Sequence, residues 1–249
     1  MMSTHTVFEI FVALHIVTGA VGLVSFWIPV AGRKGGPGHA RYGKLFALMM
    51  LTTGSFAVGI ALTTLSDPIA THPHLVGHPD FAQPGLIGGI FGHMMLYLAV
   101  LTINLAWHGW LCIRDRRGPV ANRAWHNLLL QVLLLAVALN CAWQGWQLQQ
   151  VLMIAISGVG FATVATNLWY IYKPKPRSVD RIKEHIKSLV GAGISVYTAF
   201  FAFGAVRLLP EIALTPALWS VPLITGLTLI IYHQRAVMLR FRARTAQTA

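Results

Sequence analysis

Charged side chains, and acidic ones above all, are scarce in this sequence of 249 residues. Only seven residues are aspartate or glutamate, and all charged residues together make up 10% of the chain. Soluble domains carry roughly 25% charged residues, so this composition excludes an ordinary soluble domain. Cysteine is also rare. Cys112 falls at the end of one apolar run and Cys141 inside another, so neither a disulfide framework nor a CxxC metal site is expected.

The motifs of several enzyme classes are missing as well. The glycine-rich stretch at residues 35–43 lacks the lysine–serine or lysine–threonine ending of a phosphate-binding loop, and no strand precedes it. No G-x-S-x-G, H-E-x-x-H or paired-histidine motif occurs. Seven-helix zinc hydrolases of the ceramidase type carry an H-x-x-x-H in the last helix and a companion S-x-x-x-H, and both are absent here. The sequence leaves open whether the protein is an enzyme.

What the sequence does contain is long apolar runs. Hydrophobic residues make up 55% of the chain, and the mean hydropathy is +0.62. A helix of about 20 apolar residues is long enough to cross the hydrocarbon core of a bilayer. Seven such runs occur, at residues 7–30, 43–65, 85–111, 124–147, 151–172, 186–209 and 217–233. The sequence therefore predicts an all-α polytopic membrane protein whose seven transmembrane helices form a single domain over residues 1–249.

The basic residues predict the orientation of these helices. Eighteen of the 19 lysines and arginines follow the first, third, fifth and seventh runs, and only Arg207 does not. Basic residues gather on the cytoplasmic side of membrane proteins, so the amino terminus is expected outside and the carboxyl terminus in the cytoplasm, across the inner (cytoplasmic) membrane. The net charge of +12 is thereby explained by topology and by contact with the lipid bilayer, and nucleic acid is not an expected partner.

Eleven histidines form the most informative excess in the chain. Ionisable residues at membrane depth are costly and usually functional. His15 and His93 each lie about eight residues into an inward-running helix, so both imidazoles are expected at a similar depth. His108 lies about 22 Å further along the helix that holds His93. Two layers of histidine, one near each side of the membrane, are therefore predicted.

Histidines at two depths are typical of proteins that hold haem for electron transfer across a bilayer. The leading hypothesis is a protein that binds haem b or another histidine-ligated redox metal, with His15 and His93 as outer ligands. His108 with His126 or His185 would form the inner pair, with Asn104, Asn127 or Gln131 as hydrogen-bond partners of the ligands. His39 and Arg41 would lie beside the inner cofactor. A quinone or another redox protein would exchange electrons with it, and a homo-oligomer is compatible with the sequence.

Two rival hypotheses use the same residues. In a transporter or sensor, the histidines would relay protons or line a substrate path, together with a polar stripe formed by Asn140, Gln144 and Gln147 on one face of the fourth helix. In a purely structural partner subunit, no single histidine would matter.

A further metal site is suggested by the loop between the second and third runs. His72, His74 and His78 lie within seven residues, and Asp67 and Asp80 flank them. Three neighbouring imidazoles can gather a transition metal ion. This loop is expected outside the membrane.

Several short motifs resemble a group of bacterial multi-pass membrane proteins of unknown function. They are His15 with Gly19, the loop Lys34-Gly35…His39-x-Arg41-x-Gly43, His93, and the segment from His185 to Phe203, HIKSLVGAGISVYTAFFAF, followed by Pro210, Leu218-Trp219 and Pro222. Ala40 departs from the group's pattern, in which an arginine stands beside the histidine of the loop. The resemblance implies a membrane fold and no particular activity.

Overall fold

The computed structural model describes residues 3–114, 122–206 and 215–247, and throughout these ranges the chain is helical or forms short connections. The prediction of an all-α protein is confirmed for this part of the chain, which contains no strand. The long helices are α1 (Thr4–Ala31), α2 (Pro37–Ser66), α4 (Met95–Arg114), α5 (Trp125–Gln147), α6 (Val151–Ile171), α7 (Ser178–Val206) and α9 (Pro216–Gln247). Between α2 and α4 lie the short elements α3 (Pro68–Thr71), η1 (Pro73–Leu75), η2 (Pro79–Phe81) and the π-helix η3 (Gly88–Met94).

Within the ranges that the structure describes, six helical segments are long and apolar enough to cross a membrane. They are α1, α2, η3 with α4, α5, α6 and the 217–247 part of α9. The predicted span at 186–209 lies on α7, which is not among these six, and its last residues fall outside the described ranges. The structure thus supports a multi-pass membrane protein with six candidate spanning helices among the described residues.

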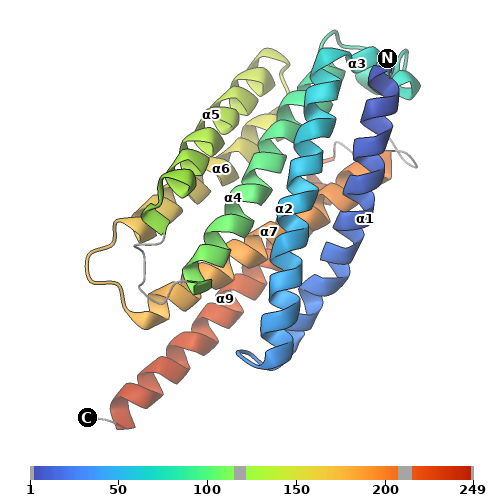
Figure 1. Ribbon diagram of the computed structural model, residues 1–249. Coiled ribbons are helices and arrows are strands. Elements are labelled where there is room, and N and C mark those ends of the chain that lie inside the picture. The colour runs from blue at the N-terminus through green and yellow to red at the C-terminus, as the bar shows by residue number, and fades with distance from the viewer. Residues whose placement is uncertain (1–2, 115–121, 207–214, 248–249) are drawn as a thin grey trace.

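Helix α4 occupies the middle of the bundle. It packs against α2 on one side, α5 on the other and α7 behind it, while α1 covers α2, α6 covers α5 and α9 covers α7 (Figure 1). In the most apolar part of the segment Gly88–Arg114, 72% of the residues are buried, against 17% in α1. Polar side chains on α4 therefore face protein and not lipid, which is where a membrane protein can satisfy them.

Small residues allow the helices to approach closely. A Cβ atom at Gly160 in α6 would lie 2.7 Å from the Tyr97 ring of α4 and 3.0 Å from Ala138 of α5. Helices in membranes associate through this kind of close contact between glycine and a neighbouring side chain. Gly160 thereby fixes α6 against both α4 and α5.

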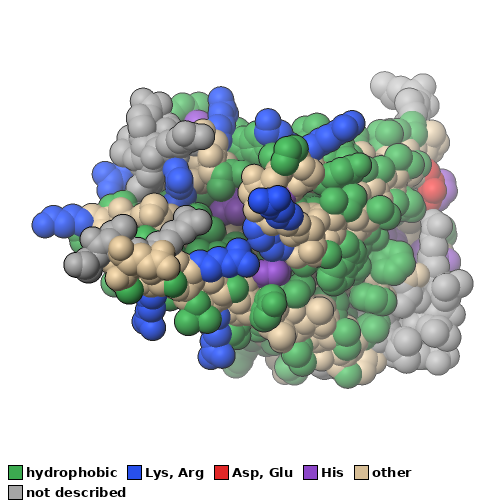
Figure 2. All heavy atoms as spheres, turned by 90° about the horizontal axis from the view of Figure 1, so that it is seen from below, with side chains coloured by type: hydrophobic (Ala, Val, Ile, Leu, Met, Phe, Trp, Pro, Cys, Tyr) green, Lys and Arg blue, Asp and Glu red, His purple; other side chains and the backbone are tan. Residues whose placement is uncertain are grey.

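One end of the bundle carries most of the lysine and arginine side chains, and Figure 2 shows it face on. This basic end includes the connection between α1 and α2, where Gly35 adopts a φ of 76° that favours glycine. Lys34 donates hydrogen bonds to the carbonyls of Pro29 and Val30, and His39 Nδ1 lies 3.1 Å from the Pro29 oxygen. The glycine-rich stretch is therefore a turn whose basic side chains cap the end of α1.

Candidate functional site

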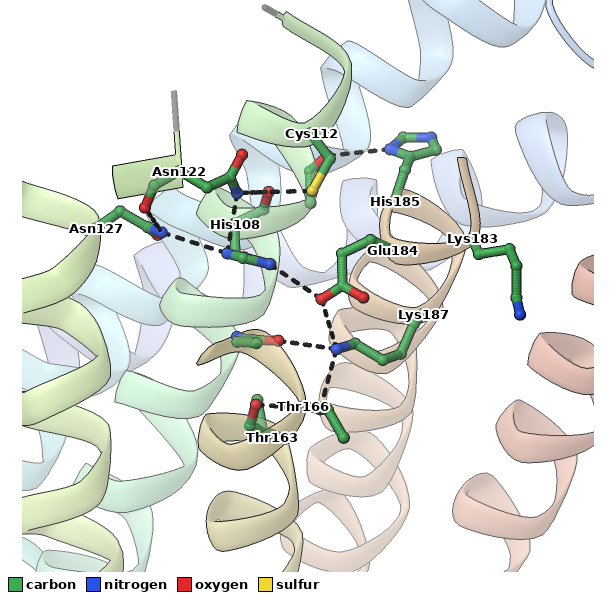
Figure 3. A network of polar contacts seen from close by, with 12 residues as sticks. His108, Cys112, Asn122, Asn127, Thr163, Thr166, Lys183, Glu184, His185 and Lys187 are labelled. Atoms are coloured by element: carbon green, nitrogen blue, oxygen red, sulfur yellow. Dashed lines mark hydrogen bonds and ion pairs between the residues drawn. The ribbon is translucent and has the colours of Figure 1, made fainter. Parts of the chain in front are cut away.

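A buried histidine on α4 is the centre of a network of polar contacts inside the bundle (Figure 3). The side chain of His108 is completely buried, and its Nε2 atom lies 3.1 Å from Oε1 of Glu184 on α7. An ionised carboxylate only accepts hydrogen bonds, so Nε2 carries the proton in this pair. His108 and Glu184 thus tie α4 to α7.

Two asparagines donate to the other ring nitrogen of His108. Nδ1 lies 3.0 Å from Nδ2 of Asn122 and 3.3 Å from Nδ2 of Asn127. Asn127 Nδ2 also donates to the backbone oxygen of Asn122 at 2.7 Å, and Asn122 Nδ2 donates to the backbone oxygen of His108 at 3.3 Å. Because carbonyl oxygens only accept, these bonds fix the orientation of both amides. His108 is therefore neutral here, with Nδ1 as an acceptor.

Lys187 completes a group of charges beside His108. Its Nζ atom lies 2.6 Å from Oε1 of Glu184, one turn earlier on α7. It also lies 3.0 Å from Oγ1 of Thr166 and 3.0 Å from Oδ1 of Asn167, both on α6. All three ammonium protons have acceptors. The ion pair joins α7 to α6.

The network continues across the middle of the bundle through three amide side chains. Nδ2 of Asn167 donates to Oδ1 of Asn104 on α4 at 3.0 Å and to Oε1 of Gln131 on α5 at 3.2 Å. Asn104 in turn donates to the backbone oxygen of Leu130 at 3.1 Å. Asn104 and Asn167 are fully buried, and Gln131 is 2% exposed. Four helices, α4 to α7, thus share one connected polar network, which we call the His108 network.

The His108 network also contains acceptors that are not in use. Among the described residues, Oδ1 of Asn122 and Oδ1 of Asn127 are buried and have no hydrogen-bond partner. The ring of Tyr170 lies 5.9 Å from the His108 ring and covers the network on the α6 side. Native proteins leave few buried polar atoms unsatisfied, and those that remain often have a functional explanation.

The two histidines predicted as outer ligands are not brought together. His15 Nδ1 lies 3.1 Å from the backbone oxygen of Thr53 on α2, beside a cavity of about 30 Å³. That volume holds one or two water molecules. His93 Nδ1 accepts from Nδ2 of Asn140 on α5, at 3.0 Å. The two rings are held by α2 and α5, which lie on opposite sides of α4 (Figure 1).

The residues predicted for the inner layer have other partners too. His126 packs its ring against Trp107 and Trp125, with centroids 5.5 and 5.8 Å away. His185 Nδ1 lies 3.1 Å from the backbone oxygen of Gly109, and its ring is 6.5 Å from that of His39. Arg41 is exposed. Because both ring nitrogens of His108 are occupied as well, the residues at this level do not fit an inner haem, and we derive no step from one.

The loop histidines do not form a shared site either. Within the ranges that the structure describes, no three side chains of histidine, cysteine, aspartate or glutamate lie close enough to hold a metal ion. His72 is 6% exposed and packs against Phe91 and Phe8, with ring centroids at 4.4 and 5.1 Å. His78 lies 3.7 Å from Asp80 instead. Burial, with a smaller effect of His74, lowers the pKa of His72 to about 4.

Comparison with known proteins does not identify the chain. No protein-family model matches it, and no similar protein is found among curated proteins or solved structures. The resemblance noted from short motifs stays a prediction, and the function has to be argued from the His108 network.

Sequence reasoning found some members of this network and missed others. It named His108, and it named Asn104, Asn127 and Gln131 as hydrogen-bond partners. It did not name Glu184, and it counted Lys187 only among the basic residues that follow the fifth apolar run. The available signal was a glutamate with a lysine three residues later, directly before an apolar run in a chain with only seven acidic residues.

Proposed function

We propose that this protein is a membrane carrier that moves protons, and that His108 is the group that binds and releases them. The observation that supports this most directly is a neutral, fully buried histidine between a carboxylate and two amides inside a helical bundle. Ionisable residues inside membrane bundles commonly mark proton pathways. The partner that would hold the positive charge, Glu184, is already in contact with the ring.

Proton binding would occur at Nδ1, since Nε2 already carries a proton. A proton that enters from water at the basic end would take the lone pair of Nδ1 and form an imidazolium. The ring would then have two N–H donors, one on Glu184 and one facing the amide nitrogens of Asn122 and Asn127. Two donors facing each other repel, so protonation would favour rotation of one or both amides.

Rotation of the amides would provide a hydrogen-bond acceptor for the new N–H group at Nδ1 of the imidazolium. It would replace Nδ2 by Oδ1 next to Nδ1, and these oxygens are the buried atoms without partners in the present state. The same rotation would break the bonds from Asn127 Nδ2 to Asn122 O and from Asn122 Nδ2 to His108 O. The second of these bonds joins α4 to the segment directly before α5, so proton binding would loosen this contact. This coupling between a proton and helix packing is what a carrier requires.

Glu184 and Lys187 would keep the net charge of the site close to zero. Their charges cancel, so neutral His108 leaves no net charge in the cluster and the imidazolium adds one positive charge. A buried, uncompensated charge is costly, and this cost would favour release of the proton after the helices have moved. His108 would thus bind a proton only transiently.

The test is proton flux into liposomes that contain the purified protein and a pH-sensitive dye. With a membrane potential imposed by potassium and valinomycin, we expect flux well above that of protein-free liposomes. His108→Gln should lower it by at least about tenfold, which corresponds to about 1.4 kcal/mol of barrier. His126→Gln, which changes a histidine of the same layer outside the network, should retain it. Wild-type flux at the protein-free level, or normal flux in H108Q, would overturn the proposal.

A further inference from the structure

A groove on the outer surface of the bundle is separate from the His108 network. Helices α2 and α4 touch near Gly54, where a Cβ atom would lie 3.3 Å from the backbone oxygen of Ala99. They diverge from there towards the basic end (Figure 1). The space between them is a groove of about 340 Å³ lined by Lys44, Leu45, Ala47, Leu48, Leu51, Trp107 and Trp110.

The lining of this groove has one charged group and is otherwise apolar or aromatic. Lys44 is exposed, and among the described residues it forms no ion pair. Leu48 is 57% exposed, so a large apolar side chain is available to a ligand. Trp107 and Trp110 contribute the aromatic part of the lining. Tryptophan and lysine at the end of a membrane helix are typical of the headgroup level of a bilayer.

We propose that this groove binds one anionic phospholipid. The phosphate of the headgroup would lie against the Lys44 ammonium, and part of one acyl chain would lie along Leu45, Leu48 and Leu51. The charge of Lys44 selects an anion, and the apolar floor of the groove selects a ligand with a hydrocarbon tail. A lipid combines both properties, and basic pockets between membrane helices bind anionic headgroups in this way. This site does not depend on the proton-carrier proposal.

The choice of lipid over a soluble anion follows from where the groove lies. It lies between two helical segments that are long and apolar enough to cross a membrane, and Lys44 and Leu48 in its lining are exposed. A free phosphate could contact Lys44, but it would make no contact with the leucine side chains of the groove. Only a molecule that is anchored in the bilayer contacts both the charge and the apolar wall.

Native mass spectrometry of the full chain, released from micelles with equal amounts of phosphatidylglycerol and phosphatidylcholine, tests the site. We expect phosphatidylglycerol to be retained about fivefold more than phosphatidylcholine, the factor typical of one lysine near an anionic surface. Lys44→Gln should reduce this preference to equality. Lys175→Gln removes a positive charge from the exposed linker between α6 and α7, away from the groove, and should leave the preference unchanged.

A second variant separates the contribution of the apolar groove to lipid binding from the contribution of the Lys44 charge. Leu48→Trp fills the apolar floor without changing the charge, and because Leu48 is largely exposed the substitution should not disturb folding. We expect it to lower retention of phosphatidylglycerol to the level of K44Q. Equal retention of both lipids by the wild type, or no effect of K44Q, would overturn the proposal. Full retention by L48W would show that the headgroup binds Lys44 without the groove, which also overturns it.

Discussion

Replacement of Glu184 by glutamine tests most sharply whether the His108 network is held together by charge. Oε1 of Glu184 accepts from His108 Nε2 at 3.1 Å and from Lys187 Nζ at 2.6 Å. Glutamine has nearly the same shape and retains a side-chain oxygen, but it removes the negative charge. Any loss of stability in E184Q therefore measures the charge and not the volume of the side chain.

The expected loss follows from the two hydrogen bonds. A hydrogen bond to a charged group contributes about 1.5–3 kcal/mol and a neutral one about 0.5–1.5 kcal/mol, so the bond from neutral His108 loses about 1 kcal/mol, whereas the bond from the Lys187 ammonium stays charged on the donor side. Lys187 also loses its counterion. The side chains of Lys187 and Glu184 are 22% and 11% exposed, so water screens part of that effect. We expect E184Q to lower the free energy of unfolding by about 2–3 kcal/mol.

Reversible unfolding in mixed micelles with increasing dodecyl sulfate, followed by circular dichroism, measures this loss. Lys187→Met should also destabilise the protein, and the double variant should lose at least about 1 kcal/mol less than the sum of the single losses, as for other residues in direct contact. A loss in E184Q below about 0.5 kcal/mol, or strictly additive single effects, would refute the description of Glu184 and Lys187 as a coupled ion pair.

Two further predictions concern packing and pH. Gly160→Ala places a Cβ 2.7 Å from the Tyr97 ring and should destabilise the protein by about 1–3 kcal/mol in the same micelle assay. Gly158 has open space around it, so Gly158→Ala should be neutral or stabilising. Equal effects of the two substitutions would contradict the packing argument. The pKa of His72 is lowered from 6.5 to about 4, so the unfolded chain binds the proton first and stability should fall as the pH drops from 6.5 towards 4. His72→Phe should remove this loss from the pH dependence of the melting temperature, and an unchanged dependence would exclude His72 as its source.

The sequence was sufficient for the membrane character of the chain and for most of its helices. Composition and run length are local properties, and a run of about 20 apolar residues forms a helix in a bilayer whatever its neighbours are. The predicted runs at 124–147 and 151–172 match α5 and α6 within a few residues. The placement of α7 was less clear, because its first turns carry Asp180, Glu184 and Lys187, which lower its hydropathy.

The histidine layers show where sequence reasoning stops. A depth estimate places His15 and His93 at one level, but it does not give the direction in which each ring points. In the structure one ring faces α2 and the other faces α5. Equal depth is therefore a necessary condition for a shared site and not a sufficient one.

The sequence by itself determined that this is an all-helical membrane protein with its basic residues in alternate connections and with several polar side chains on apolar helices. Only the tertiary structure decided which of those side chains meet. His108 and Glu184 are separated by 76 positions in the chain, and their contact depends on α7 packing against α4. Hydropathy and helical period repeat along one helix, whereas the order of helices around a bundle arises from contacts between side chains that are remote in sequence.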